Sequence, residues 1–143
     1  MAVVEKSVLI EHTAAEMFTL VDDIERYPEF LPWCGGVEVH ERTGQQTSAT
    51  LHINYHGIKA NFSTVNQKEF PCLMTLKLRD GPFKALDGRW RFTPLGETAC
   101  KAEFKLHYEF ASKPLESAVG PVFNMIANTF IDSFVKRAKI VHG

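Results

Sequence analysis

Residues 101–110, KAEFKLHYEF, alternate apolar and polar side chains without interruption. An apolar face opposite a wet face predicts a strand of an antiparallel sheet that is covered on one side only. The same period of two recurs from Gly36 onward. The apolar positions of these patterns are Leu51, Ile53 and Tyr55, then Ala60 and Phe62, then Met74, Leu76 and Leu78, and finally Ala102, Phe104, Leu106, Tyr108 and Phe110.

The segment that follows, residues 113–143, has the period of a helix. Its apolar residues keep one phase across Gly120 and Pro121, and a break in the helix would normally lose that phase. We therefore expect one long helix kinked at Pro121. Further apolar residues widen the stripe, so the sheet must cover much of the helix. The stripe comprises Leu115, Val119, Val122, Ile126, Phe130, Phe134 and Ala138, widened by Phe123, Ala127, Ile131 and Val135.

The N-terminal third predicts a strand and two short helices. After the strand pattern VVEKSVLIEH, Thr13 and Glu16 have the spacing of a capping box, which marks the start of a helix. The next stretch, RYPEFLPWCGG, contains Pro28 and Pro32, and each disfavours helix at the residue before it. Between these prolines we expect about one turn of helix, followed by an irregular stretch.

This order of elements predicts an α+β helix-grip fold. A curved antiparallel sheet of about seven strands would wrap around the C-terminal helix, with two short helices after the first strand. With 143 residues, we expect the whole chain, 1–143, to form a single domain. A sheet curved around a helix leaves a gap, and such a gap is a natural ligand cavity.

Composition excludes several classes of protein. The formal net charge of -1 gives no global attraction to DNA or to an anionic membrane. Glu5 and Lys6 interrupt the N-terminal apolar stretch, which therefore lacks the core of a signal peptide, and no run reaches transmembrane length. The three cysteines, without any CxxC spacing, favour reduced thiols in a cytoplasmic protein. We keep peripheral attachment to the inner membrane as a second location.

Two stretches resemble the signatures of a known family. YPEFLPWC at residues 27–34 and GPFKALDGRWRF at residues 81–92 are similar to those of the coenzyme Q-binding START-domain proteins, and the resemblance spans essentially the whole chain. It implies a non-enzymatic domain that holds a hydrophobic molecule such as ubiquinone, requires no cofactor and has a role in respiration. A bacterial branch, the ribosome association toxins of the RatA type, implies an alternative: a toxin that binds the large ribosomal subunit, blocks subunit association and has an antitoxin partner. Polyketide cyclases and aromatases share this kind of scaffold, so an enzyme is a third alternative by fold analogy.

Aromatic residues at irregular positions are the candidates for a ligand site. Trp33 lies on the broken segment and Trp90 follows the GPFK turn, where a cavity could open, although each could equally be plain core. The candidate cavity-lining residues are Phe30, Leu31, Trp33, Phe83, Trp90, Phe123 and Ile126.

Signals for catalysis and metal binding are weak. His52 and His56 lie in a strand pattern without a third ligand, which favours solvated histidines. Asp22 and Asp23 are adjacent at a helix end, where a solvated position outweighs an acid/base pair, and no histidine is near Cys34 in the sequence, so a buried thiol is the simpler interpretation.

Three basic residues lie near the C-terminal end of the last predicted helix. Lys136, Arg137 and Lys139 would complement the negative end of that helix. The alternative is that they contact an anionic partner such as ribosomal RNA.

One hairpin allows a prediction of register. For Trp90 and Phe92 to share a face with Ala102, Phe104 and Leu106, the loop near Pro94-Leu95-Gly96 must contain an odd number of residues. A three-residue loop that pairs Pro94 with Thr98 would place Trp90 opposite Ala102 and Arg89 opposite Glu103.

Overall fold

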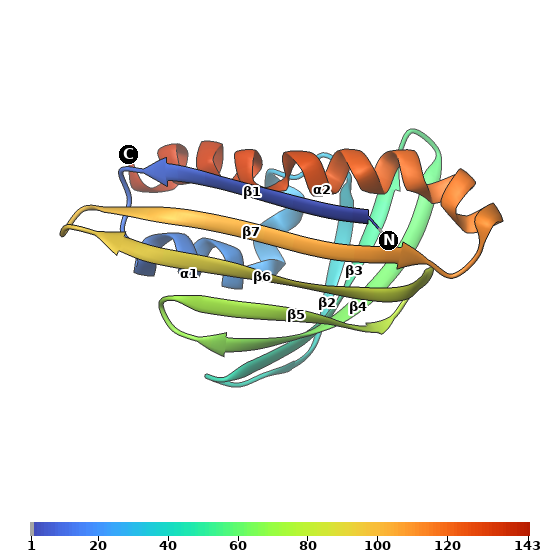
Figure 1. The fold of residues 1–143 in the computed structure, drawn as a ribbon, viewed down its shortest axis with the longest axis horizontal. Coiled ribbons are helices and arrows are strands. Elements are labelled where there is room, and N and C mark those ends of the chain that lie inside the picture. Colours follow the sequence, from blue (N-terminus) through green and yellow to red (C-terminus); the bar gives the residue numbers. More distant parts are fainter. Residues whose placement is uncertain (1) are drawn as a thin grey trace.

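The computed structural model describes residues 2–143 as one sheet packed against helices. The seven strands pair in the order β1-β7-β6-β5-β4-β3-β2, and every neighbouring pair is antiparallel (Figure 1). The predicted helix-grip fold is confirmed. The strands are β1 (Ala2–Ile10), β2 (Cys34–Arg42), β3 (Gln46–Tyr55), β4 (Ile58–Glu69), β5 (Leu73–Asp80), β6 (Phe83–Leu95) and β7 (Ala99–Phe110), and the helices are α1 (Ala14–Asp22), the 3-10 helix η1 (Ile24–Glu29) and α2 (Lys113–His142).

The sheet is strongly curved. In Figure 1, β2, β3 and β4 run steeply across the direction of β6 and β7, and α2 lies along the side of the sheet formed by β1 and β7. Gly88 lies on β6 where it passes very close to β7, because a Cβ placed there would be 2.5 Å from the carbonyl oxygen of Lys105. Only glycine allows this approach of the two backbones.

The capping box predicted at α1 is present. The Glu16 backbone N–H donates to Thr13 Oγ1 over 3.1 Å, and the Thr13 backbone N–H donates to Glu16 Oε1 over 2.9 Å. Met17 and Val21 on the same helix are fully buried. The helix therefore begins where its end groups are satisfied and packs by its apolar stripe.

The second short helix differs from the prediction. We expected it between Pro28 and Pro32, but η1 spans Ile24–Glu29 and contains Pro28. A 3-10 helix bonds residues three apart, and its bonds here come from the backbone N–H groups of Arg26, to Asp23, and of Phe30, to Tyr27. None of these bonds needs the missing N–H of Pro28, so the proline is tolerated.

The C-terminal helix is continuous, as predicted. α2 begins after Ser112, whose Oγ accepts from the Leu115 backbone N–H over 3.3 Å, and it runs through Pro121 to His142. In Figure 1 the first turns of α2 slope away from the line of the rest. The wide apolar stripe is buried at Val119, Phe123, Ile126, Ala127, Phe130, Ile131, Phe134 and Ala138.

The β6–β7 hairpin has the predicted parity but not the predicted register. Leu95 and Ala99 form the last pair of the hairpin, so its loop contains the three residues between them. Trp90 therefore lies opposite Phe104 rather than Ala102, which lies opposite Phe92 instead. The cause is Gly96, whose φ of 73° starts the turn there, so that Leu95 still belongs to the strand.

The charged pair predicted on this hairpin was wrong for the same reason. Arg89 lies opposite Lys105, and Glu103 lies opposite Arg91. The pairing Arg89–Glu103 does not occur because the turn lies one residue later in the chain than expected: β6 continues to Leu95, and β7 begins at Ala99 instead of Thr98.

Candidate ligand cavity

A pocket lies between the concave face of the sheet, η1 and α2. It contains about 680 Å³ of space between atoms, including some that is open to solvent, but only about 60 Å³ accepts the centre of a water molecule. The pocket is therefore narrow: a few waters or a slender group fit, and a bulkier ligand requires lining side chains to move. The lining consists of Val21, Ile24, Tyr27, Trp33, Ala49, Leu51, Phe62, Thr64, Asn66, Met74, Leu76, Leu86, Trp90, Phe104, Leu106, Phe123, Ile126, Ala127 and Phe130.

Aromatic rings form one wall of this pocket. The ring centroid of Trp90 lies 4.8 Å from that of Phe104 and 5.7 Å from that of Phe130, and it lies 5.3 Å from that of Phe134, which is outside the lining. Trp33 lies 6.2 Å from Phe130. Both tryptophans are thus part of the packed core and of the lining at once, so the two interpretations of them are not exclusive.

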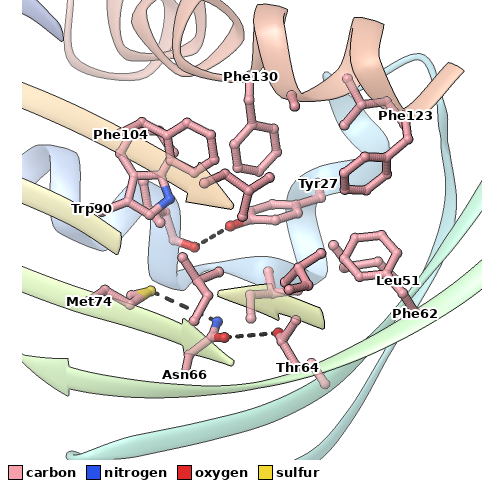
Figure 2. Close-up of a pocket in the computed structure, with 18 of the residues that line it drawn as sticks. Tyr27, Leu51, Phe62, Thr64, Asn66, Met74, Trp90, Phe104, Phe123 and Phe130 are labelled. Atoms are coloured by element: carbon pink, nitrogen blue, oxygen red, sulfur yellow. Dashed lines mark hydrogen bonds between the residues drawn. The ribbon is translucent and has the colours of Figure 1, made fainter. Parts of the chain in front are cut away.

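A few polar groups interrupt the apolar lining (Figure 2). Asn66 Oδ1 accepts from Thr64 Oγ1 over 2.9 Å, and Asn66 Nδ2 faces Met74 Sδ at 3.9 Å. The Tyr27 hydroxyl donates to the backbone oxygen of Val21 over 2.5 Å, and burial raises the pKa of Tyr27 far above its usual value of 10.0. Tyr27 is therefore a neutral hydrogen-bond donor, already engaged.

An ion pair joins α1 to the sheet beside the pocket. Lys68 lies two residues after Asn66 on the same face of β4, and its Nζ is 3.1 Å from Asp22 Oδ1. The Lys68 side chain is only 4 % exposed, and Asp22 is the last residue of α1. The carboxylate neutralises a buried ammonium group.

Four of the seven candidate residues line the pocket: Trp33, Trp90, Phe123 and Ile126. The other three lie nearby but outside the lining. Leu31 is fully buried in the core, and Phe30 packs against Phe134 at 5.2 Å between ring centroids. Phe83 packs behind Phe123, with their ring centroids 4.7 Å apart.

Several lining residues were missed from the sequence. Thr64 and Asn66 share the face of β4 that carries Phe62, and all three are buried. Polar residues on an otherwise apolar strand face are a usable signal, because buried amides are rarely placed without a partner. Tyr27, Phe104 and Phe130 carry no such signal, because each resembles an ordinary core aromatic.

The residues considered for chemistry lie elsewhere. His52 bonds Asn61 and Glu38, at 2.7 Å and 3.1 Å. His56, with φ of 49°, occupies the β3–β4 turn. Burial raises the pKa of the Cys34 thiol. Within residues 2–143 no group of three metal-ligating side chains is present.

The three basic residues of α2 differ in their surroundings. Arg137 Nη2 bonds Glu29 Oε1 over 2.9 Å, and its guanidinium lies 5.1 Å from the centre of the Phe30 ring. Lys136 and Lys139 are exposed. No helix among the described residues is long and apolar enough to cross a membrane.

Comparison with known proteins agrees with this architecture. Residues 10–135 match the model of the family described as polyketide cyclase / dehydrase and lipid transport. The chain is 44 % identical over 140 residues to the ribosome association toxin RatA of Vibrio cholerae, covering 98 % of this chain and 97 % of the relative. It is 23 % identical over 138 residues to the mitochondrial coenzyme Q-binding protein COQ10 of Drosophila melanogaster, covering 94 % of this chain and 57 % of the relative.

Among solved structures, a START superfamily protein from Mycobacterium smegmatis superposes with a TM-score of 0.76 at 20 % identity, covering 97 % of this chain and 98 % of the other. This likeness shows the shared fold. Together with the family match over most of the chain, it leads to one assignment: the chain belongs to the polyketide cyclase / dehydrase and lipid transport family and has its START-like helix-grip fold.

Proposed function

We propose that this protein binds a hydrophobic molecule, ubiquinone or a similar lipid, in the cavity between its sheet and α2, and has a role in respiration. The observation that carries the proposal is the pocket itself, whose lining is mostly aromatic and aliphatic, with Thr64, Asn66 and the Tyr27 hydroxyl among its few polar groups. Such linings are typical of sites for apolar ligands. The family's description as lipid transport and a relative named coenzyme Q-binding protein support it.

The proposed role is binding without catalysis. The lining contains no carboxylate, amine or histidine, and its one phenol, on Tyr27, is bonded to a backbone oxygen. The buried thiol of Cys34 has a raised pKa and lies outside the lining. A cyclase-like enzyme, the remaining alternative, would need a proton donor or acceptor within reach of its substrate.

An organic extract of the purified protein tests this proposal. We expect quinone in the extract, and we expect the protein stripped of it to take up added quinone. Ala127→Met is the matched control. Ala127 is a small buried lining residue, so a longer side chain there would fill the cavity and should prevent the uptake of quinone. If neither the extract nor the refilled protein carries quinone, the proposal is wrong.

A second candidate function is action on the ribosome in the cytoplasm, with an antitoxin as partner. It is favoured by relatives at 36–44 % identity that are named ribosome association toxins. The exposed Lys136 and Lys139 are the residues of α2 best placed to contact RNA phosphates. Arg137 is already engaged with Glu29 and Phe30, so its loss would also disturb the contact between α2 and the segment after η1.

Sedimentation of ribosomes with added protein tests the second candidate. We expect fewer joined ribosomes and more free subunits, and a weaker effect for the double variant Lys136→Gln, Lys139→Gln. The contribution of these lysines should shrink as salt rises, because phosphate contacts release counterions. Arg137→Gln is made separately, with thermal unfolding as a check on its fold. An unchanged sedimentation profile at several protein concentrations would exclude this function.

A further inference from the structure

The indole N–H of Trp90 is buried without an acceptor. Trp90 is 0 % exposed, and its Nε1 has no hydrogen-bond partner within residues 2–143. In Figure 2 the indole nitrogen lies on the edge of the ring that faces the middle of the pocket. An unmet buried donor costs about 1–3 kcal/mol, so the position needs a reason beyond packing.

A second donor faces the same pocket. The oxygen of the Asn66 amide is occupied by Thr64, whereas its nitrogen faces only the thioether of Met74, which is a weak acceptor. Met74 lies directly opposite Trp90 across β5 and β6. Trp90 and Asn66 are therefore both neighbours of Met74, and each brings an N–H group to the lining.

No free charge accompanies these donors. The lining contains no ionised side chain, and Lys68, the cation two residues from Asn66, is neutralised by Asp22. A carboxylate placed here would lose its hydration without gaining a cation, and a pure hydrocarbon would leave the donors unmet. A neutral acceptor, such as a carbonyl oxygen, is the group that complements the site.

We propose that Trp90 Nε1 and Asn66 Nδ2 each donate a hydrogen bond to a carbonyl oxygen of a neutral, apolar ligand. This inference rests on the proposed binding function and narrows it to a ligand class. A quinone belongs to that class, whereas a fatty-acid anion and an alkane do not. The aromatic wall holds the body of the ligand, and the two N–H groups select its carbonyl groups.

Three probes with alkyl chains of nine or ten carbons separate these possibilities by calorimetric titration: decyl-p-benzoquinone, decylbenzene and decanoate. We expect the quinone to bind the native protein at least about tenfold more tightly than decylbenzene, since one hydrogen bond of about 1.4 kcal/mol corresponds to a factor of ten. Decanoate should bind more weakly than either. Trp90→Phe and Asn66→Leu should each weaken quinone binding about tenfold more than they weaken decylbenzene binding.

Thr47→Val is the matched control. Thr47 is 0 % exposed, and its Oγ1 also has no partner among the described residues, but it is not part of the lining. Removing its hydroxyl should not change the affinity for any probe. Asn66→Leu keeps the test valid if Trp90→Phe unfolds, and thermal unfolding of each variant shows which case applies.

The outcomes distinguish the two proposals. If no probe binds the native protein, the proposed binding function fails. If quinone and decylbenzene bind with equal affinity, or if both variants weaken the two probes equally, the cavity binds apolar molecules but the recognition of a carbonyl group is wrong.

Discussion

Lys68 Nζ lies 3.1 Å from Asp22 Oδ1 although the Lys68 side chain is only 4 % exposed. The pair fixes the C-terminal end of α1 to β4 beside the pocket. Asp22 is unfavourable at a helix C-terminus by itself, because the partial charge there is also negative, and Lys68 compensates it.

Asp22→Asn should therefore destabilise the protein by about 1–3 kcal/mol, because it leaves a buried ammonium group without its counter-charge. The figure is below that of a fully buried pair, since the Asp22 side chain is 27 % exposed. Adding Lys68→Met should recover most of the loss, and a double-mutant cycle from urea unfolding measures the coupling. Additive effects of the two changes would contradict this account.

Gly88→Ala should cost about 1–3 kcal/mol, because the new Cβ would lie 2.5 Å from the backbone oxygen of Lys105 and 2.9 Å from Leu106 Cδ1. The backbones of β6 and β7 would have to separate. Gly44→Ala is the control: nothing lies within 4 Å of a Cβ at Gly44. Urea unfolding of both variants checks the prediction, and equal stabilities would show that β6 and β7 are not in such close contact.

The capping box of α1 should make the stability of the protein depend on pH. The hydrogen bond from the Thr13 backbone N–H is the main factor that lowers the pKa of Glu16 below its usual 4.5, with His142 adding a smaller effect. Because the pKa of Glu16 is lower in the folded state than in the unfolded state, its ionised carboxylate stabilises the protein at pH values above the unfolded-state pKa. This stabilisation is lost as the pH falls through the folded-state pKa.

The stability difference between the native protein and Glu16→Gln should consequently be largest near neutral pH and should shrink below about pH 4.5. Unfolding in urea at a series of pH values measures this. Glu97→Gln, in the exposed β6–β7 loop, should show no such trend. Thr13→Ala should cost about 1 kcal/mol at neutral pH by removing the other half of the box.

The three thiols should react at very different rates. Cys72 is exposed, whereas Cys34 and Cys100 are buried, and burial raises the pKa of both buried thiols. Because the thiolate is the reactive form, a maleimide reagent at pH 7 should modify Cys72 first. Mass spectrometry of the labelled peptides identifies the site. Early labelling of Cys34 would show that the segment after η1 opens readily.

Much of the fold could be predicted because it follows from local periodicity. The alternation around Phe104 and the unbroken phase of α2 depend on which residues avoid water, and both were confirmed. The register of the β6–β7 hairpin depends on where the turn begins. That position was decided by the backbone conformation of Gly96, to which hydrophobic patterning is insensitive.

The site was less predictable, for a geometric reason. Trp33 lines the pocket, whereas Phe30 and Leu31, a few residues earlier on the same irregular segment, do not. In a strand or helix, spacing tells which residues share a face, but an irregular segment has no such period. The role of Asn66 depends on Met74 and Trp90, which reach it from other strands.

The position of β1 in the sheet has a consequence for synthesis of the chain. β2 to β6 each pair with the strand before or after them, so these hairpins can form as soon as they emerge. β1 pairs only with β7, and Ala2 faces Tyr108 across that pair. Until β7 has been made, the apolar side of β1, with Val4 and Ile10, has no strand to join and is a site for premature association. Of these seven strands, β1 is translated first and is thus among the last to pair.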